Sequence, residues 1–169
     1  HRDLGSTAGA AMSMQRLAEV RIAQGRPAEA TELAERALPL ARASMVAGHL
    51  LQRIFGTLVV AAPDPDLARV AVDRAEATLG WDEECTFCAV MLAVPATIAC
   101  ARVGDLDHAR RHLQVAEFSV AAWSDTSWGA AVLEARAAVA AAEGDVAEAE
   151  HLLDAAARGF DLAGQPLDA

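Results

Sequence analysis

The sequence predicts an all-α fold made of about four antiparallel helical hairpins. Turn residues recur about every forty positions, a period typical of helical repeat arrays, and alanines stand five and twelve positions after each of them. The turns are at Gly25, Pro63, Gly104 and Gly144. The alanines are Ala30, Ala37, Ala68, Ala75, Ala109, Ala116, Ala149 and Ala156. Apolar residues between the turns follow the period of an amphipathic helix, and no segment alternates as a strand does.

The chain is predicted to be a single repeat domain over residues 1–169, which is long enough to bury a core. Each hairpin is expected to place one helix before its turn and one after it. The four hairpins are predicted at about residues 6–43, 44–80, 82–122 and 125–163. Because the chain starts with His1 and shows no signal-peptide pattern, we expect a fragment of a larger, cytoplasmic protein.

Local signals support both helices of the first hairpin. Ser6 or Thr7 is expected to cap a helix that runs to Gln24, because a hydroxyl oxygen accepts a hydrogen bond from the first turn. Gly25 is expected to end that helix, since glycine tolerates the left-handed backbone at such ends. Pro27 then opens the second helix, at a position where its missing N–H costs nothing.

The second hairpin carries similar signals. Ser44 is the expected cap of a helix over residues 44–61. Asp64 or Asp66 is expected to cap the next helix, because a carboxylate accepts hydrogen bonds from the N–H groups of a first turn. Gly80 is expected to end that helix.

The last two hairpins follow the same pattern. The third is expected to contain helices over residues 82–103 and 105–122, the first of them starting at Asp82 or a neighbouring acidic residue. The loop over residues 123–126 is expected to cap a helix that ends at Glu143. The final helix is expected to extend to about Ala163, just before a glycine and a proline.

The charge of the chain argues against several classes of partner. The formal net charge is −10, the pI is about 4.8, and all 14 basic residues are arginine. Nucleic acids and anionic membranes attract positive surfaces, so we expect neither as a partner. No apolar run reaches the roughly 18 residues of a membrane span. A phosphate-binding loop of the G-x-x-x-x-G-K-[ST] type needs a lysine, and this chain has none.

A C-x-x-C motif formed by Cys85 and Cys88 is the only motif that suggests chemistry. It could be half of a zinc site or a redox pair, and His108 and His112 could supply two further ligands. In the expected antiparallel hairpin, however, the two pairs lie roughly 20 Å apart. The acidic residues 82–84 would also oppose formation of a thiolate. We therefore expect reduced cysteines with a packing role, no metal and no cofactor.

His108 and His112 are predicted to lie on the helix surface beside Arg110 and Arg111, in the locally basic spot of the chain. A solvated helix face explains this spot more simply than a binding role does. No motif places a base beside a nucleophile, so the sequence predicts a protein without catalytic activity.

The spacing of small residues resembles that of the tetratricopeptide repeat. The small residue of the first helix in each hairpin is Ala18, Gly56, Thr97 and Ala137. The apolar residue of the second helix is Ala34, Val72, Leu113 and Leu153. The chain departs from that family in its longer period, about forty instead of thirty-four residues, and in lacking the aromatic residues of the first helix. Met14, Gln52, Ala93 and Leu133 stand at one of those aromatic positions.

The last hairpin is also similar to the terminal repeats of large ATP-dependent LuxR-type, maltose-regulator-like transcriptional regulators of actinobacteria. The similarity rests on residues 144–149 (GDVAEA), 152–156 (LLDAA) and 160–167 (FDLAGQPL). It implies a sensing and assembly arm that sits beside an ATPase module and a helix-turn-helix module. The motifs of those two modules are missing from this sequence.

The tetratricopeptide resemblance implies a right-handed superhelical array in which the first helices of the hairpins line a concave groove. The groove is expected to be lined by Met12, Gln15, Glu19, Arg53, Thr57, Met91, Val94, Ile98 and Glu134. Such a groove could receive a protein segment, a peptide or a small-molecule effector.

We therefore expect a non-catalytic protein-interaction or effector-sensing domain of a transcriptional regulator. One alternative is a general peptide-binding scaffold unrelated to transcription. A peptide clamp of that kind needs a cluster of basic and amide side chains, and the expected groove offers only Arg53 and Gln15. A second alternative is an enzyme, which would need catalytic groups that converge in the groove, and the sequence signals none.

Overall fold

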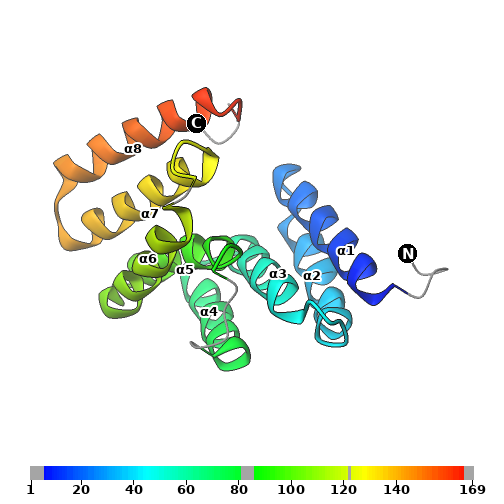
Figure 1. The fold of residues 1–169 in the computed structure, drawn as a ribbon. Coiled ribbons are helices and arrows are strands. Elements are labelled where there is room, and N and C mark those ends of the chain that lie inside the picture. Colours follow the sequence, from blue (N-terminus) through cyan, green and yellow to red (C-terminus); the bar gives the residue numbers. More distant parts are fainter. Residues whose placement is uncertain (1–5, 81–85, 122, 166–169) are drawn as a thin grey trace. The chain divides into compact units, whose positions relative to one another are not determined.

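The computed structural model describes residues 6–80, 86–121 and 123–165. Within these ranges the chain forms eight α-helices and no β-strand, which confirms the predicted all-α fold (Figure 1). The helices are α1 (Thr7–Ala23), α2 (Pro27–Arg42), α3 (Ala47–Ala61), α4 (Pro65–Leu79), α5 (Val90–Arg102), α6 (Leu106–Val120), α7 (Ser127–Glu143) and α8 (Val146–Leu162). None of these helices is both long and apolar enough to cross a membrane.

The chain divides into two compact units, His1–Leu92 and Ala93–Ala169. In the first unit, α1 packs against α2 and α3, and α3 also packs against α2 and α4. In the second unit, α7 packs against both α6 and α8. Helices joined by a short turn, such as α1 and α2 or α7 and α8, therefore lie side by side as hairpins (Figure 1).

The recurring alanines form the contacts between these helices. All eight of them are buried, with at most 8% of their surface exposed. In the first unit, Ala18 of α1, Ala30 of α2 and Ala61 of α3 form one buried cluster. In the second unit, Ala130 of α7 packs with Ala156 and Phe160 of α8. Small side chains at these positions let two helix backbones approach closely, so the predicted repeat spacing is confirmed as a packing pattern.

Three of the four turns have the same hydrogen-bonded geometry. Gly25, Gly104 and Gly144 have positive φ angles of 70°, 77° and 87°. In the third of these turns the Gly144 N–H donates to the Ala141 carbonyl, and the following N–H donates to the Ala140 carbonyl. The other two turns repeat this pair of bonds, which is the Schellman arrangement and satisfies carbonyls at the end of a helix.

Three of the expected helix caps are present. Ser6 accepts a hydrogen bond from the Gly9 N–H at the start of α1. Asp64 accepts one from the Leu67 N–H at the start of α4. Thr126 is the cap of α7, as the loop over residues 123–126 predicted.

Two expected helix starts are wrong. α3 begins at Ala47 and not at Ser44, because the Ser44 hydroxyl instead donates to the Ala41 carbonyl at the end of α2, at 2.9 Å. α5 begins at Val90, because residues 86–89 form turns instead of helix. The predicted start at Asp82 lies outside the described residues.

Candidate functional site

Four of the nine predicted groove residues lie together where α1 packs against α3 in the first unit. The amide nitrogen of Gln15 donates to the Thr57 hydroxyl at 2.9 Å and to the Glu19 carboxylate at 2.6 Å. The Thr57 hydroxyl in turn donates to the backbone carbonyl of Arg53, one helical turn earlier, at 2.9 Å. Gln15 and Thr57 are only 1% and 6% exposed, so this chain of hydrogen bonds is largely shielded from water.

Helices α1 and α3 also carry buried polar atoms that no described residue satisfies. They are the side-chain oxygen of Gln15, both side-chain polar atoms of Gln52, and the Nε of Arg53. Buried polar groups in folded proteins are nearly always hydrogen-bonded, and one left unsatisfied costs about 1–3 kcal/mol. Several such atoms on two packed helices therefore call for an explanation. We call Gln15, Glu19, Gln52, Arg53 and Thr57 the α1–α3 polar cluster.

Arg53 gives the polar cluster a positive centre. Its side chain is half-buried, whereas both glutamines are almost fully buried, so solvent reaches Arg53 more easily than either glutamine. Burial lowers the pKa of Arg53, and the positive charge of Arg16 lowers it further, while Glu19 and Cys88 oppose this. Arginine stays protonated in proteins. Burial and the nearby Arg16 therefore leave a cation whose surroundings would favour an added negative charge.

Gln52 belongs to the cluster but was not among the predicted site residues. It is completely buried, yet it occupies the helix position at which the other hairpins carry Met14, Ala93 and Leu133. A polar side chain at a position that is otherwise apolar was the signal that could have identified it.

A close backbone contact also joins α3 to the segment around Met91. A Cβ atom added to Gly56 would lie 2.0 Å from the Met91 carbonyl oxygen, so only glycine allows this backbone approach. In a regular helix the Met91 carbonyl would accept a hydrogen bond from the N–H of residue 95. That residue is proline, which has no N–H, so the carbonyl receives no such bond. The Met91 backbone is therefore held against α3, and the turn that precedes it lies near the start of that helix.

The remaining five predicted groove residues are divided between the two units. Met12 lies half-buried on α1, and Met91 is half-buried at the end of the first unit. Val94, Ile98 and Glu134 belong to the second unit. The groove that spans all nine residues therefore stays a prediction.

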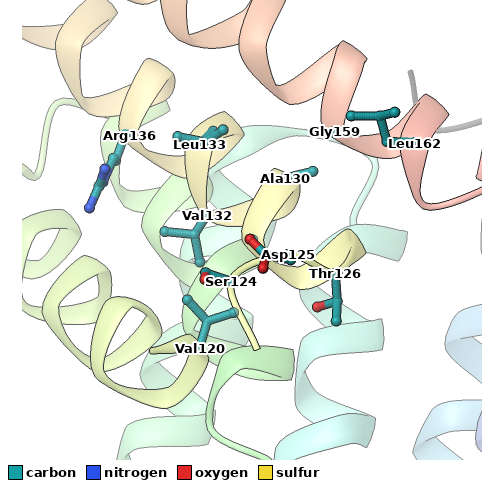
Figure 2. A pocket seen from close by; sticks show the side chains of 11 residues that line it. Val120, Ser124, Asp125, Thr126, Ala130, Val132, Leu133, Arg136, Gly159 and Leu162 are labelled. Carbon is teal, nitrogen blue, oxygen red and sulfur yellow. The ribbon is translucent and has the colours of Figure 1, made fainter. Parts of the chain in front are cut away.

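The second unit contains a pocket of about 560 Å³ that the sequence did not predict (Figure 2). It is lined by Val120, Ser124, Asp125, Thr126, Gly129, Ala130, Val132, Leu133, Arg136, Gly159 and Leu162. Arg136 already donates to Glu117 at 2.7 Å. The pocket thus offers mainly apolar walls and a rim of loop hydroxyls, with the Asp125 carboxylate as a further charged group beside the paired Arg136.

The cysteine and histidine residues have different surroundings from those expected. Cys85 lies outside the described residues, so the C-x-x-C motif is not tested as a pair. The Cys88 sulfur lies 3.1 Å from Nδ1 of His49. The prediction that His112 lies on the surface is wrong, since it is 4% exposed. His108 is half-buried and pairs with Asp105 at 2.9 Å, so neither histidine is part of an open basic face.

No protein-family model matches this chain, and no match was found among curated proteins or solved structures.

Proposed function

We propose that this chain is a non-catalytic repeat domain that binds a carboxylate-bearing peptide or small effector, as the sensing arm of a transcriptional regulator. The observation that carries the binding proposal is the α1–α3 polar cluster. It combines a half-buried arginine with two buried glutamines whose polar atoms are partly unsatisfied. A guanidinium pairs well with a carboxylate, and glutamine amides match the donors and acceptors of a peptide group.

The unsatisfied amides of the two glutamines fit a ligand site better than a structural role. Unsatisfied buried amides lower the stability of the fold, whereas apolar residues of similar size would not. Proteins commonly retain such destabilising groups at binding sites, where a ligand completes their hydrogen bonds. A small movement of the Arg53 side chain would be enough to bring a ligand carboxylate to the cluster.

The regulator part of the proposal rests on the sequence resemblance of the last hairpin and on its regular helical repeats. The alternative, a general peptide-binding scaffold unrelated to transcription, shares the same polar cluster. The complete open reading frame distinguishes the two, because an encoded ATPase module or helix-turn-helix module would support the regulator. A reading frame that encodes the repeats and neither module would favour the general scaffold.

The binding proposal is tested with a panel of small dicarboxylates and short acidic peptides, each paired with its amidated form. We expect calorimetry to detect binding of one or more carboxylate forms, with the matching amide weaker by at least about tenfold. That factor follows from the roughly 1.5–3 kcal/mol that a hydrogen bond to a charged group contributes. Arg53→Gln should reduce the affinity by a similar factor.

Arg36→Gln is the matched control, because Arg36 is an exposed arginine on α2. It should leave binding unchanged. Equal affinity for a carboxylate and its amide, or full binding by Arg53→Gln, would show that the polar cluster is not the carboxylate site.

A further inference from the structure

One face of α3 carries side chains at helical spacing that meet the turn over residues 86–89. His49, Arg53 and Gly56 follow one another at intervals of four and three residues, so they lie along one side of the helix. Gly56 receives the backbone of Met91, and Cys88 stands one turn earlier in the chain. This packing places the Cys88 thiol beside the first turns of α3.

The Cys88 thiol has a base within hydrogen-bond distance. Its sulfur lies 3.1 Å from Nδ1 of His49, and that ring is exposed while Cys88 itself is half-buried. Arg53 lies on the same helix face, and a negative charge on Cys88 would interact favourably with its guanidinium. From α1, Arg16 lowers the pKa of this arginine and Glu19 raises it, with the effect of Arg16 the larger of the two.

A cysteine next to a histidine and an arginine has the surroundings of a reactive thiol. The thiolate is the nucleophilic form, and positive neighbours favour it. The acidic residues 82–84 precede the turn in the sequence and work against this effect, but they lie outside the described residues. Within the described residues, His49 lies within hydrogen-bond distance of the sulfur, and Arg53 is close enough for its charge to interact with that of Cys88.

We propose that Cys88 is a modification site for hydroperoxides, with His49 as its proton acceptor. His49 takes the thiol proton, and the resulting thiolate attacks one oxygen of the hydroperoxide. An S–O bond forms as the O–O bond breaks, and His49 returns the proton to the departing hydroxide or alkoxide. The products are cysteine sulfenic acid and water or an alcohol, so sulfur is oxidised by two electrons and the peroxide is reduced by two.

The surroundings favour a hydroperoxide over a bulkier electrophile. The sulfur is half-buried, so a small oxidant reaches it more easily than a large organic reagent does. His49 and Arg53 supply N–H donors that can polarise an O–O bond. Cys100 provides an internal contrast, because it is fully buried and should react slowly.

The experiment uses the whole chain with Cys85→Ser, so that the labelled thiol near the turn is Cys88 alone. Hydrogen peroxide is added at pH 7, sulfenic acid is trapped with dimedone, and mass spectrometry gives the rate at Cys88 and at Cys100. We expect Cys88 in the folded chain to react about tenfold faster than the same cysteine in urea, because His49 and Arg53 favour the thiolate only in the folded chain. We expect His49→Asn to remove most of that advantage.

His151→Asn is the matched control, because His151 is an exposed histidine on α8. It should leave the rate unchanged. Circular dichroism shows whether each variant is folded, and His49→Gln replaces His49→Asn if the latter is not. A folded-state rate at Cys88 no higher than the rate in urea would overturn the proposal. A rate that a folded His49 variant keeps in full would also overturn it.

Discussion

Gln52 lies on α3 with none of its surface exposed and with neither side-chain polar atom hydrogen-bonded to a described residue. Gln15, in the same cluster, is nearly as buried, but its amide nitrogen donates two hydrogen bonds. The two glutamines are buried to a similar extent, but they therefore contribute differently to stability. The free energy of burying an amide is recovered only where its partners are present.

We predict that Gln52→Leu raises the free energy of unfolding by about 1 kcal/mol or more, because leucine has a similar volume and no unsatisfied polar atoms. Gln15→Leu should instead lower it, since that change removes the bonds to Thr57 and Glu19. Urea denaturation of both variants measures the difference. A Gln52→Leu variant that is less stable than the wild type would mean that this amide is well satisfied in the folded protein.

Gly56 and Gly48 offer a second comparison within the same helix. A Cβ atom at Gly56 would meet the Met91 carbonyl oxygen at 2.0 Å, whereas one at Gly48 would meet nothing within 4 Å. Gly56→Ala should therefore destabilise the protein by about 3 kcal/mol, at the upper end of overpacking effects. Gly48→Ala should stabilise it by about 0.5 kcal/mol through helix propensity. Thermal unfolding of both variants checks this, and similar midpoints would contradict the close contact at Gly56.

At the scale of elements, several helices end in turns whose glycines have a left-handed backbone conformation. Gly104 has φ +77° and open space around its missing Cβ, so a substitution there acts through backbone strain alone. We predict that Gly104→Val lowers the free energy of unfolding by about 1–2 kcal/mol, the strain of a left-handed residue that is not glycine. Gly48→Val, at a glycine with ordinary φ and open space, should change it by much less. An unchanged urea midpoint for Gly104→Val would show that the turn tolerates a β-branched residue.

Helix caps give a further test at this scale. Asp64 accepts a hydrogen bond from the Leu67 N–H at 2.8 Å, so Asp64→Ala should destabilise the protein by about 1 kcal/mol. Ser44 caps no helix start, and its hydroxyl bonds only the last turn of α2. Ser44→Ala should therefore have a smaller effect in the same denaturation experiment. The opposite order would mean that the first turn of α4 does not depend on its cap.

Most helices could be predicted because their signals are local. The period of the alanines, the glycine turns and the proline at a first helical position each act within a few residues of where they stand. Ser44 was misplaced because a serine can bond either the helix behind it or the helix ahead, and the sequence does not decide between them. The start of α5 was missed because the acidic residues near position 82 looked like a cap, whereas residues 86–89 form turns.

The candidate site could be predicted only in part, for a related reason. Gln15, Glu19, Arg53 and Thr57 follow from which helix of each hairpin lines the groove and from the helical period. Identifying Gln52 requires knowing that it is buried, at a position where the other hairpins have apolar residues. The pairing of His49 with Cys88 depends on the path of the chain after Gly80, which has no periodic signal.

At the scale of the whole molecule, the charge of the chain restricts its partners. Of the arginines, Arg74 binds Glu35 through two hydrogen bonds, Arg110 binds Glu143, and Arg136 binds Glu117. These pairs neutralise positive charge that the surface would otherwise present. With 24 acidic and 14 basic residues, the remaining charge is strongly negative.

We predict that the chain binds neither duplex DNA nor ATP at physiological salt. A surface with net charge −10 repels a polyanion, and the gain from releasing counterions requires a positive patch. ATP binding usually relies on a phosphate-binding loop with a lysine, and this sequence has no lysine. Of the two arginines near Glu19, Arg16 is already paired with it at 2.8 Å, and Arg53 alone suits one carboxylate better than a triphosphate. Fluorescence anisotropy with labelled duplex and calorimetry with ATP measure both affinities. Micromolar binding of either would show that the arginines form a phosphate-binding surface despite the net charge.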